Sequence, residues 1–130
     1  MVGHEGIKVT PDELESRART FALRCMRVVD ALPLNASGRS VGQQLVRSAT
    51  SVYANYRATR RGRSDKEFLA KLSIVVEEVD EAEMWLGLIA DAGLLPSPRL
   101  ASLRKEAGEL MRIFAASRKT ASGKRKPPST

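Results

Sequence analysis

Apolar residues in the segment 65–92 recur at alternating steps of four and three positions. This spacing places their side chains on one side of an α-helix, where they can pack against neighbouring helices. Such a helix is about 40 Å long at the usual rise of about 1.5 Å per residue. The apolar positions are Phe68, Leu72, Val75, Val79, Ala82, Leu86 and Ile89. A chain with this helix needs other helices to cover its apolar side.

Three further segments show helical spacing of apolar residues. In the segment 10–32 these residues are Leu14, Ala18, Phe21, Cys25, Val28 and Leu32, and in the segment 97–117 they are Leu100, Leu103, Ala107, Leu110 and Phe114. In the segment that follows a short connection at 35–38 and ends at 60–63, they are Val41, Leu45 and Val52, with either Ser48 or Ala49 and either Asn55 or Tyr56. No segment alternates with the period of a β-strand. The sequence therefore predicts an all-α fold, an up-down-up-down antiparallel four-helix bundle.

Capping residues separate these helices. Thr10 and Ser64 each precede a helix and have a glutamate three residues later, which is the pattern of a capping box. Pro33 ends the first helix, because the residue before a proline is pushed out of the α region. Gly62 and Gly93 are typical of the left-handed residue that follows a helix. The connections are therefore short, as an antiparallel bundle requires.

A chain of 130 residues with 42% hydrophobic residues is long enough for one domain. We expect a flexible segment at 1–9, the bundle at 10–117 and a disordered tail at 118–130, whose five basic residues and two prolines cannot build a core. No apolar run has the length of a membrane span, and the N-terminus does not resemble a signal peptide. Cys25 is the only cysteine. This composition predicts a cytoplasmic protein without membrane contact.

Charge divides the middle of the chain into two opposite halves. The segment 37–64 carries six arginines and no acid, whereas the segment 65–92 carries eight acids and two lysines. The net charge of the whole chain is +7. Two consecutive helices of opposite charge must lie against partners of opposite sign, which are either each other or further copies of the chain.

Several polar residues fall at or beside the predicted core. Ser48 and Asn55 lie on the apolar side of the second helix, where they must find hydrogen-bonding partners. In an antiparallel pair of helices, Arg47 is the arginine best placed to reach Glu78 or Glu81. We therefore predict a structural polar core that consists of Arg47, Ser48, Asn55, Glu78 and Glu81.

The second helix also offers a face for nucleic acid. Tyr53, Arg57 and Arg60 recur at steps of four and three, which places an aromatic ring beside two guanidinium groups, and Arg61 and Arg63 follow. Such a face can hold phosphates and stack an unpaired base. The alternative is that Arg57, Arg60 and Arg61 pair with acids of the third helix. The sequence leaves both interpretations open.

Two pairs of glutamates suggest an enzyme as an alternative. Glu78 and Glu81 lie on one helical flank, as do Glu106 and Glu109. Two facing pairs of this type could bind Mg²⁺, in an arrangement similar to that of all-α nucleotide pyrophosphatases. The competing interpretation is a solvated or arginine-paired flank. His4 is the only histidine, which removes Ser-His and Cys-His pairs and histidine-containing metal sites. We expect no catalytic residue, metal or cofactor.

The second and third helices carry a resemblance to a known family. The matching residues are Gln44-Leu45-x-Arg47-Ser48-Ala49-x-Ser51-Val52-x-Ala54-Asn55, then Arg63-Ser64-x-x-Glu67-Phe68, then Glu81 and Glu83. They resemble the four-helix-bundle family of 23S rRNA intervening-sequence proteins, and the chain is also similar to the accessory bundle protein of diversity-generating retroelements. Ala58-Thr59 stand where many members have a Glu-Gly pair.

The resemblance implies a small cytoplasmic bundle that assembles into a ring, a homopentamer, with RNA or a reverse transcriptase as possible partners. It implies no enzymatic activity, and the function of the family is unassigned. Together with the basic helix, it leads to the hypothesis of a non-enzymatic homo-oligomer that binds nucleic acid, RNA in particular. The rival hypotheses are a Mg-dependent nucleotide hydrolase and a scaffold whose charge only drives assembly.

Overall fold

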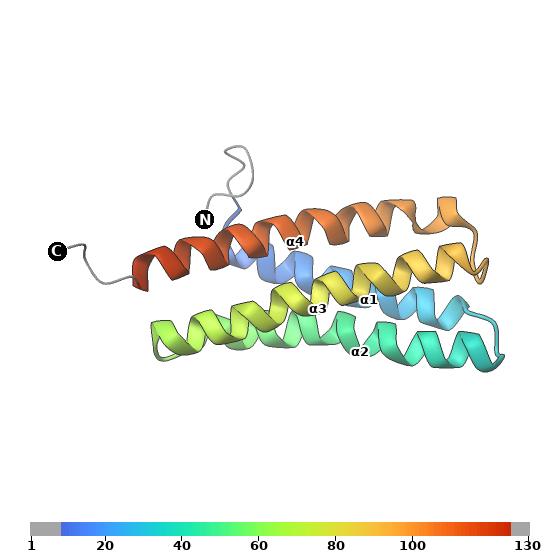
Figure 1. Cartoon of the computed structure of the whole chain (residues 1–130), viewed down its shortest axis with the longest axis horizontal. Coiled ribbons are helices and arrows are strands. Elements are labelled where there is room, and N and C mark those ends of the chain that lie inside the picture. Colours follow the sequence, from blue (N-terminus) through green and yellow to red (C-terminus); the bar gives the residue numbers. More distant parts are fainter. Residues whose placement is uncertain (1–8, 126–130) are drawn as a thin grey trace.

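A computed structural model describes the backbone of residues 9–125 and the side chains up to residue 123 (Figure 1). Four helices follow one another along the chain, and the described residues contain no β-strand. The helices are α1 (Pro11–Ala31), α2 (Ala36–Thr59), α3 (Asp65–Asp91) and α4 (Ser97–Arg125). The prediction of an all-α four-helix bundle is confirmed.

The four helices run antiparallel, and each packs against its two neighbours around the bundle (Figure 1). The short turns join α1 to α2, α2 to α3 and α3 to α4, while α4 returns beside α1 and closes the bundle. The contact between α1 and α4 is the smallest of the four. In the described part of the chain, no helix has the length and apolar character needed to cross a membrane.

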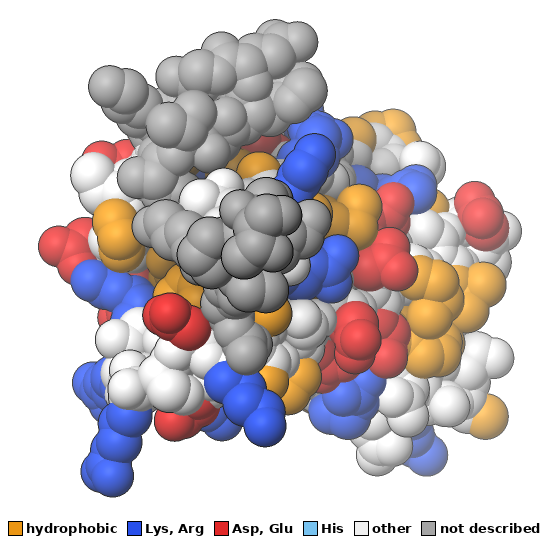
Figure 2. Space-filling model, turned by 60° about the vertical axis from the view of Figure 1, so that its left-hand side comes forward, with side chains coloured by type: hydrophobic (Ala, Val, Ile, Leu, Met, Phe, Trp, Pro, Cys, Tyr) orange, Lys and Arg blue, Asp and Glu red, His pale blue; other side chains and the backbone are white. Residues whose placement is uncertain are grey.

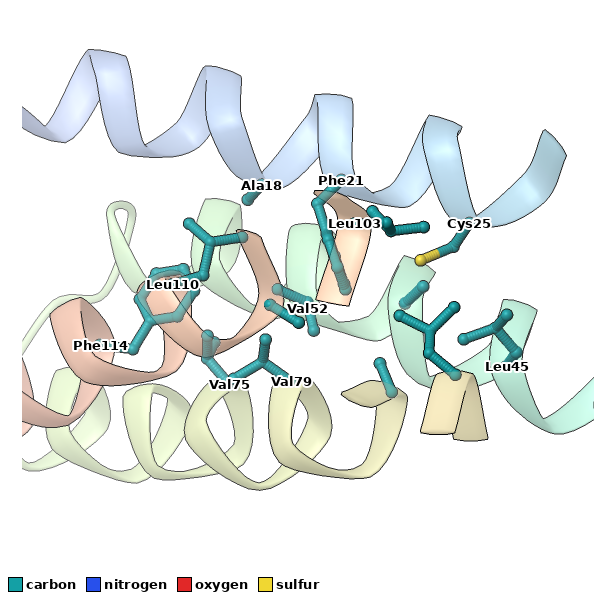
Figure 3. Close-up of a cluster of buried hydrophobic side chains, with 14 of the residues drawn as sticks. Ala18, Phe21, Cys25, Leu45, Val52, Val75, Val79, Leu103, Leu110 and Phe114 are labelled. Carbon is teal, nitrogen blue, oxygen red and sulfur yellow. The ribbon is translucent and has the colours of Figure 1, made fainter. Parts of the chain in front are cut away.

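The core is built from the predicted apolar stripes, with side chains from all four helices meeting along the axis (Figure 3). Every predicted position on α4 is buried, and on α3 only Phe68 remains partly exposed. Tyr56 and Phe114 pack with their ring centroids 5.2 Å apart. The largest fully buried side chains are Phe21, Phe114, Leu14, Leu45, Leu72, Leu86, Ile89, Leu100 and Leu110.

The helix ends follow the predicted caps with one exception. The side chains of Thr10 and Ser64 accept hydrogen bonds from the backbone N–H groups three residues on, at 3.1 Å each. Gly93 has a φ of 69°, as a left-handed C-cap requires. Gly62 does not have a positive φ, so that prediction is wrong. A Cβ at Gly62 would lie 3.2 Å from the carbonyl oxygen of Thr59, so glycine here serves close packing.

The folded part of the chain extends further than predicted at both its N-terminal and its C-terminal side. α4 continues to Arg125 instead of ending near Ser117, so disorder does not apply to residues 118–125. Alanines favour the helix here, Thr120 Oγ1 bonds to its own helix at 3.1 Å, and the first proline that would stop the helix is Pro127. Val9, predicted to be flexible, is buried in the core. Predictions for residues 1–8 and 126–130 lie outside the described residues.

Candidate nucleic-acid interface

Basic side chains gather beside the turn that joins α2 to α3. They line an open hollow of about 660 Å³ on the outer side of the two helices. α2 contributes residues four positions apart, which lie on one helical face. The turn and the first turns of α3 close the hollow. Its side chains are those of Tyr53 and Arg57 from α2, Arg61 and Arg63 from the turn, and Glu67 and Lys71 from α3, with Ala54 and Ala58 between them.

Four cations line this hollow, and none of them forms an ion pair with another described residue. Glu67 is the only acid among the lining residues, and it accepts a hydrogen bond from the backbone N–H of Arg63 at 3.4 Å. Arg57 and Arg61 are exposed, and Tyr53 is half-buried beside them. The hollow therefore combines surplus positive charge with one aromatic ring.

Arg60 does not belong to this face, although its spacing placed it beside Tyr53 and Arg57. Its guanidinium group turns toward α1 and pairs with Asp12 at 2.7 Å and with Glu15 at 3.0 Å. The hydrogen bond with Asp12 raises the pKa of Arg60 above its ordinary value. α1 runs antiparallel to α2, so its acidic first turns lie beside the end of α2. Arg60 is thus a structural residue.

Arg47 forms the predicted bridge between α2 and α3. It donates to Glu78 Oε2 at 2.9 Å and also binds Glu81. The indole N–H of Trp85 donates to the same Glu81 carboxylate at 3.2 Å. Arg47, Glu78 and Glu81 thus form one polar cluster, which lies on the outer side of the helix pair and not in the core.

Ser48 and Asn55 find their partners within α2. Ser48 is fully buried, as predicted, and its hydroxyl donates to the carbonyl oxygen of Gln44 at 3.1 Å. Asn55 is only half-buried, and its side-chain amide donates to the carbonyl oxygen and the hydroxyl of Ser51, at 3.0 and 2.8 Å. Asn55 is therefore not part of the core, contrary to the predicted polar core. Tyr56 occupies the core position instead.

The second pair of glutamates is also held by an arginine. Arg17 of α1 binds Glu106 at 2.7 Å and Glu109 at 2.9 Å. The pair on α3 therefore points toward α2 and the pair on α4 toward α1, so the two pairs do not face one another. The described residues contain no cluster of acids, cysteines or histidines suited to a metal ion. This geometry corresponds to the arginine-paired flank and not to a Mg²⁺ site.

Sequence reasoning missed Lys71 and placed the basic residues Arg118 and Lys119 in a disordered tail. Lys71 completes the hollow from α3, one helical turn after Glu67. Arg118 and Lys119 lie on the part of α4 that was expected to be disordered, and they line a second hollow between α3 and α4. All three residues lie on a continuous helix, and this position is the signal that could have identified them. For Arg118 and Lys119, the predicted helix end near Ser117 hid that signal.

Comparison with known proteins identifies relatives in sequence and in structure. Residues 13–116 match the model of a family described as 23S rRNA-intervening sequence protein. A crystal structure of a protein of unknown function from the S23 ribosomal protein family of Bacteroides thetaiotaomicron VPI-5482 has the same fold, with a TM-score of 0.78. The two sequences are 24% identical, over 84% of this chain and 97% of that one. None of the curated proteins matches this chain.

Proposed function

The chain belongs to the 23S rRNA-intervening sequence protein family, and we propose that it is a non-enzymatic bundle that binds single-stranded RNA and assembles with copies of itself. One observation carries the RNA proposal. Arg47 and Arg60 are ion-paired to neighbouring helices, whereas Arg57, Arg61 and Lys71 converge on one hollow without ion-pair partners among the described residues. Guanidinium groups without carboxylate partners are available to phosphates.

The chemistry of the hollow suits a single strand better than a duplex. Tyr53 lines the hollow together with the cations, and an unpaired base can stack on its ring. Paired bases in a duplex present no free face to such a ring. Arg57 and Arg61 follow Tyr53 at steps of four residues, so they can hold the phosphates of nucleotides next to the stacked base. One copy offers few contacts, so several copies acting on one strand raise the affinity through effective concentration.

Self-assembly is supported by a second apolar face on α3. Ile74, Met84 and Leu88 are each more than 40% exposed, although they lie on a helix that already buries another face in the core. Hydrophobic side chains that gather on the surface mark contact sites. Figure 2 shows hydrophobic and acidic side chains side by side on the right-hand flank of the molecule. We propose that this face contacts another copy, in the ring of five that the family resemblance implies.

The test of RNA binding is a titration of fluorescein-labelled single-stranded RNA, followed by anisotropy over a series of salt concentrations. Arg57→Gln combined with Arg61→Gln removes two cations from the hollow. The slope of log K against log salt should become shallower by about 1.4, because each phosphate contact to a single strand contributes about 0.7. The matched control is Arg27→Gln with Arg39→Gln, two exposed arginines at the other end of the bundle that form no ion pair with another described residue.

The control pair should leave the slope unchanged, because its arginines lie away from the hollow. The control is matched because both variants lose the same net charge. Circular-dichroism melts show whether each variant is folded. Absence of RNA binding by the wild-type chain at low salt would contradict the proposal. Equal losses in the hollow variant and the control variant would also contradict it, because they would show that net charge alone decides.

A further inference from the structure

The last turns of α4 hold basic residues in fixed positions. α4 runs as a continuous helix to Arg125, and Arg118 and Lys119 line an open hollow of about 700 Å³ between α3 and α4. Leu69 and Ala115 give this second hollow apolar surface, and Ser73 and Ser122 add hydroxyl groups. No acid is among its lining residues. A cationic rim beside apolar surface fits a nucleotide, which has a charged phosphate and a flat apolar base.

The two hollows lie on opposite sides of the same turns of α3. Glu67 and Lys71 line the first hollow, and Leu69 and Ser73 line the second. Residues two positions apart on an α-helix point about 200° apart, so these pairs face in opposite directions. They are within about 9 Å of one another along the axis, and a helix with its side chains is about 10 Å wide. Only the width of α3 separates the two clusters.

All the elements involved meet at one end of the bundle. The end of α2, the start of α3 and the end of α4 lie together on the left in Figure 1. Figure 2 turns this end toward the viewer and shows Lys and Arg side chains at several places around it. Cations on both flanks of α3 therefore lie at the same end of the bundle.

We propose that one single strand of nucleic acid crosses the first turns of α3 and contacts both hollows. Its phosphates meet Arg57, Arg61 and Lys71 on one flank and Arg118 and Lys119 on the other. This inference rests on the proposed function and adds to it a second, rigid binding element. It also replaces the expectation that the C-terminal basic residues act as a flexible tail without fixed geometry.

The experiment compares two double variants of the full chain by the same RNA titration. Arg118→Gln with Lys119→Gln removes the two cations of the second hollow and retains helix-forming side chains. Arg99→Gln with Lys105→Gln removes the same charge from exposed positions nearer the start of α4. The first variant should flatten the salt dependence by about 1.4, and the second should not change it. Arg118→Lys should retain the wild-type slope, since it keeps the charge.

Several outcomes separate this inference from the proposed function. If Arg57→Gln with Arg61→Gln weakens binding but Arg118→Gln with Lys119→Gln behaves like its control, the second hollow does not bind the strand and the inference is overturned. The proposed function then stands. If the wild-type chain does not bind RNA, both fall. If the α4 variant alters the mass measured by light scattering and leaves the salt slope unchanged, the hollow is a contact between copies, which also overturns the inference.

Discussion

Arginines close together on α2 have different roles because their surroundings differ. Arg60 lies on the side of α2 that faces the acidic first turns of α1, and two carboxylates hold it. Arg57, less than one turn earlier, faces away from α1 and keeps its charge available. Sequence spacing alone gives both residues the same face. The side chains of the neighbouring helix decide between them, and their position depends on how the bundle closes.

Asn55 and Tyr56 give the sharpest test of the core boundary at the level of single residues. Asn55→Ala should change the free energy of unfolding by less than about 0.5 kcal/mol, because Asn55 bonds only within its own helix and alanine favours helix. Tyr56→Ala should cost about 3–5 kcal/mol, as for other large buried aromatic residues. Urea denaturation measures both. A loss above about 2 kcal/mol for Asn55→Ala would place Asn55 in the core.

Two buried groups that ionise at alkaline pH, a thiol and a phenol, predict a loss of stability there. Burial raises the pKa of the Cys25 thiol from 9.0 to about 12 and that of the Tyr56 hydroxyl from 10.0 to about 12. The folded state therefore favours the protonated forms, so their stabilisation is complete below pH 9 and is lost as the pH rises toward 12. Urea midpoints measured between pH 8 and about 12 should fall, and Tyr56→Phe should reduce the fall above about pH 10. A urea midpoint that does not change with pH would contradict the burial of these two groups.

At the level of helices, the apolar spacing predicted which elements form and which side each buries. The positions from Leu72 to Ile89 on α3 are buried as the pattern requires. The spacing could not predict the end of α4, because basic residues are as compatible with a helix as with a disordered tail until packing is known. It also missed that α3 presents a second apolar face. Hydrophobic spacing identifies the face that packs in the core. The exposure of Met84 and Leu88 is known only once the fold shows which surfaces the other helices cover.

The turn between α1 and α2 depends on the absence of a side chain at Gly38. A Cβ at this position would overlap the carbonyl oxygen of Pro33, which is backbone and cannot move aside. Gly38→Ala should lower the free energy of unfolding by about 1–3 kcal/mol, as in other overpacked sites. Gly123→Ala on α4 is the matched control, since no atom lies within 4 Å of its Cβ position. The control should stabilise the helix by up to about 1 kcal/mol. Thermal melts compare the two, and an equal response would show that the turn can relax.

At the scale of the whole molecule, arginines bridge neighbouring helices on the surface of the bundle, and two of them each hold a pair of glutamates. Arg17 joins α1 to the glutamates of α4, and Arg47 joins α2 to those of α3. The first bridge lies across the smallest helix contact of the bundle, where apolar packing contributes least. The two glutamate pairs that were considered as a Mg²⁺ site thus connect neighbouring helices. The two basic hollows and the outer face of α3 remain exposed in a single copy.

The outer face of α3 predicts that the chain does not remain a monomer. Met84 and Leu88 lie one turn apart, 48% and 43% exposed, and Ile74 lies earlier on the same helix. Burying them against another copy removes apolar surface from water, which is favourable at about 25 cal/mol per Å². Light scattering at micromolar concentration and moderate salt should therefore give a mass several times 14.2 kDa.

Charged substitutions on this face test whether it is the contact. Met84→Glu with Leu88→Glu should shift the measured mass to that of the monomer, because a charge buried without a partner costs several kcal/mol. The control is Thr20→Glu with Ala101→Glu, which adds the same charge at exposed positions on α1 and α4 and should keep the wild-type mass. Both variants should remain helical by circular dichroism, since all four positions are at the surface. A wild-type mass of 14.2 kDa would rule out self-assembly, and an unchanged mass in the α3 variant would move the contact to another face.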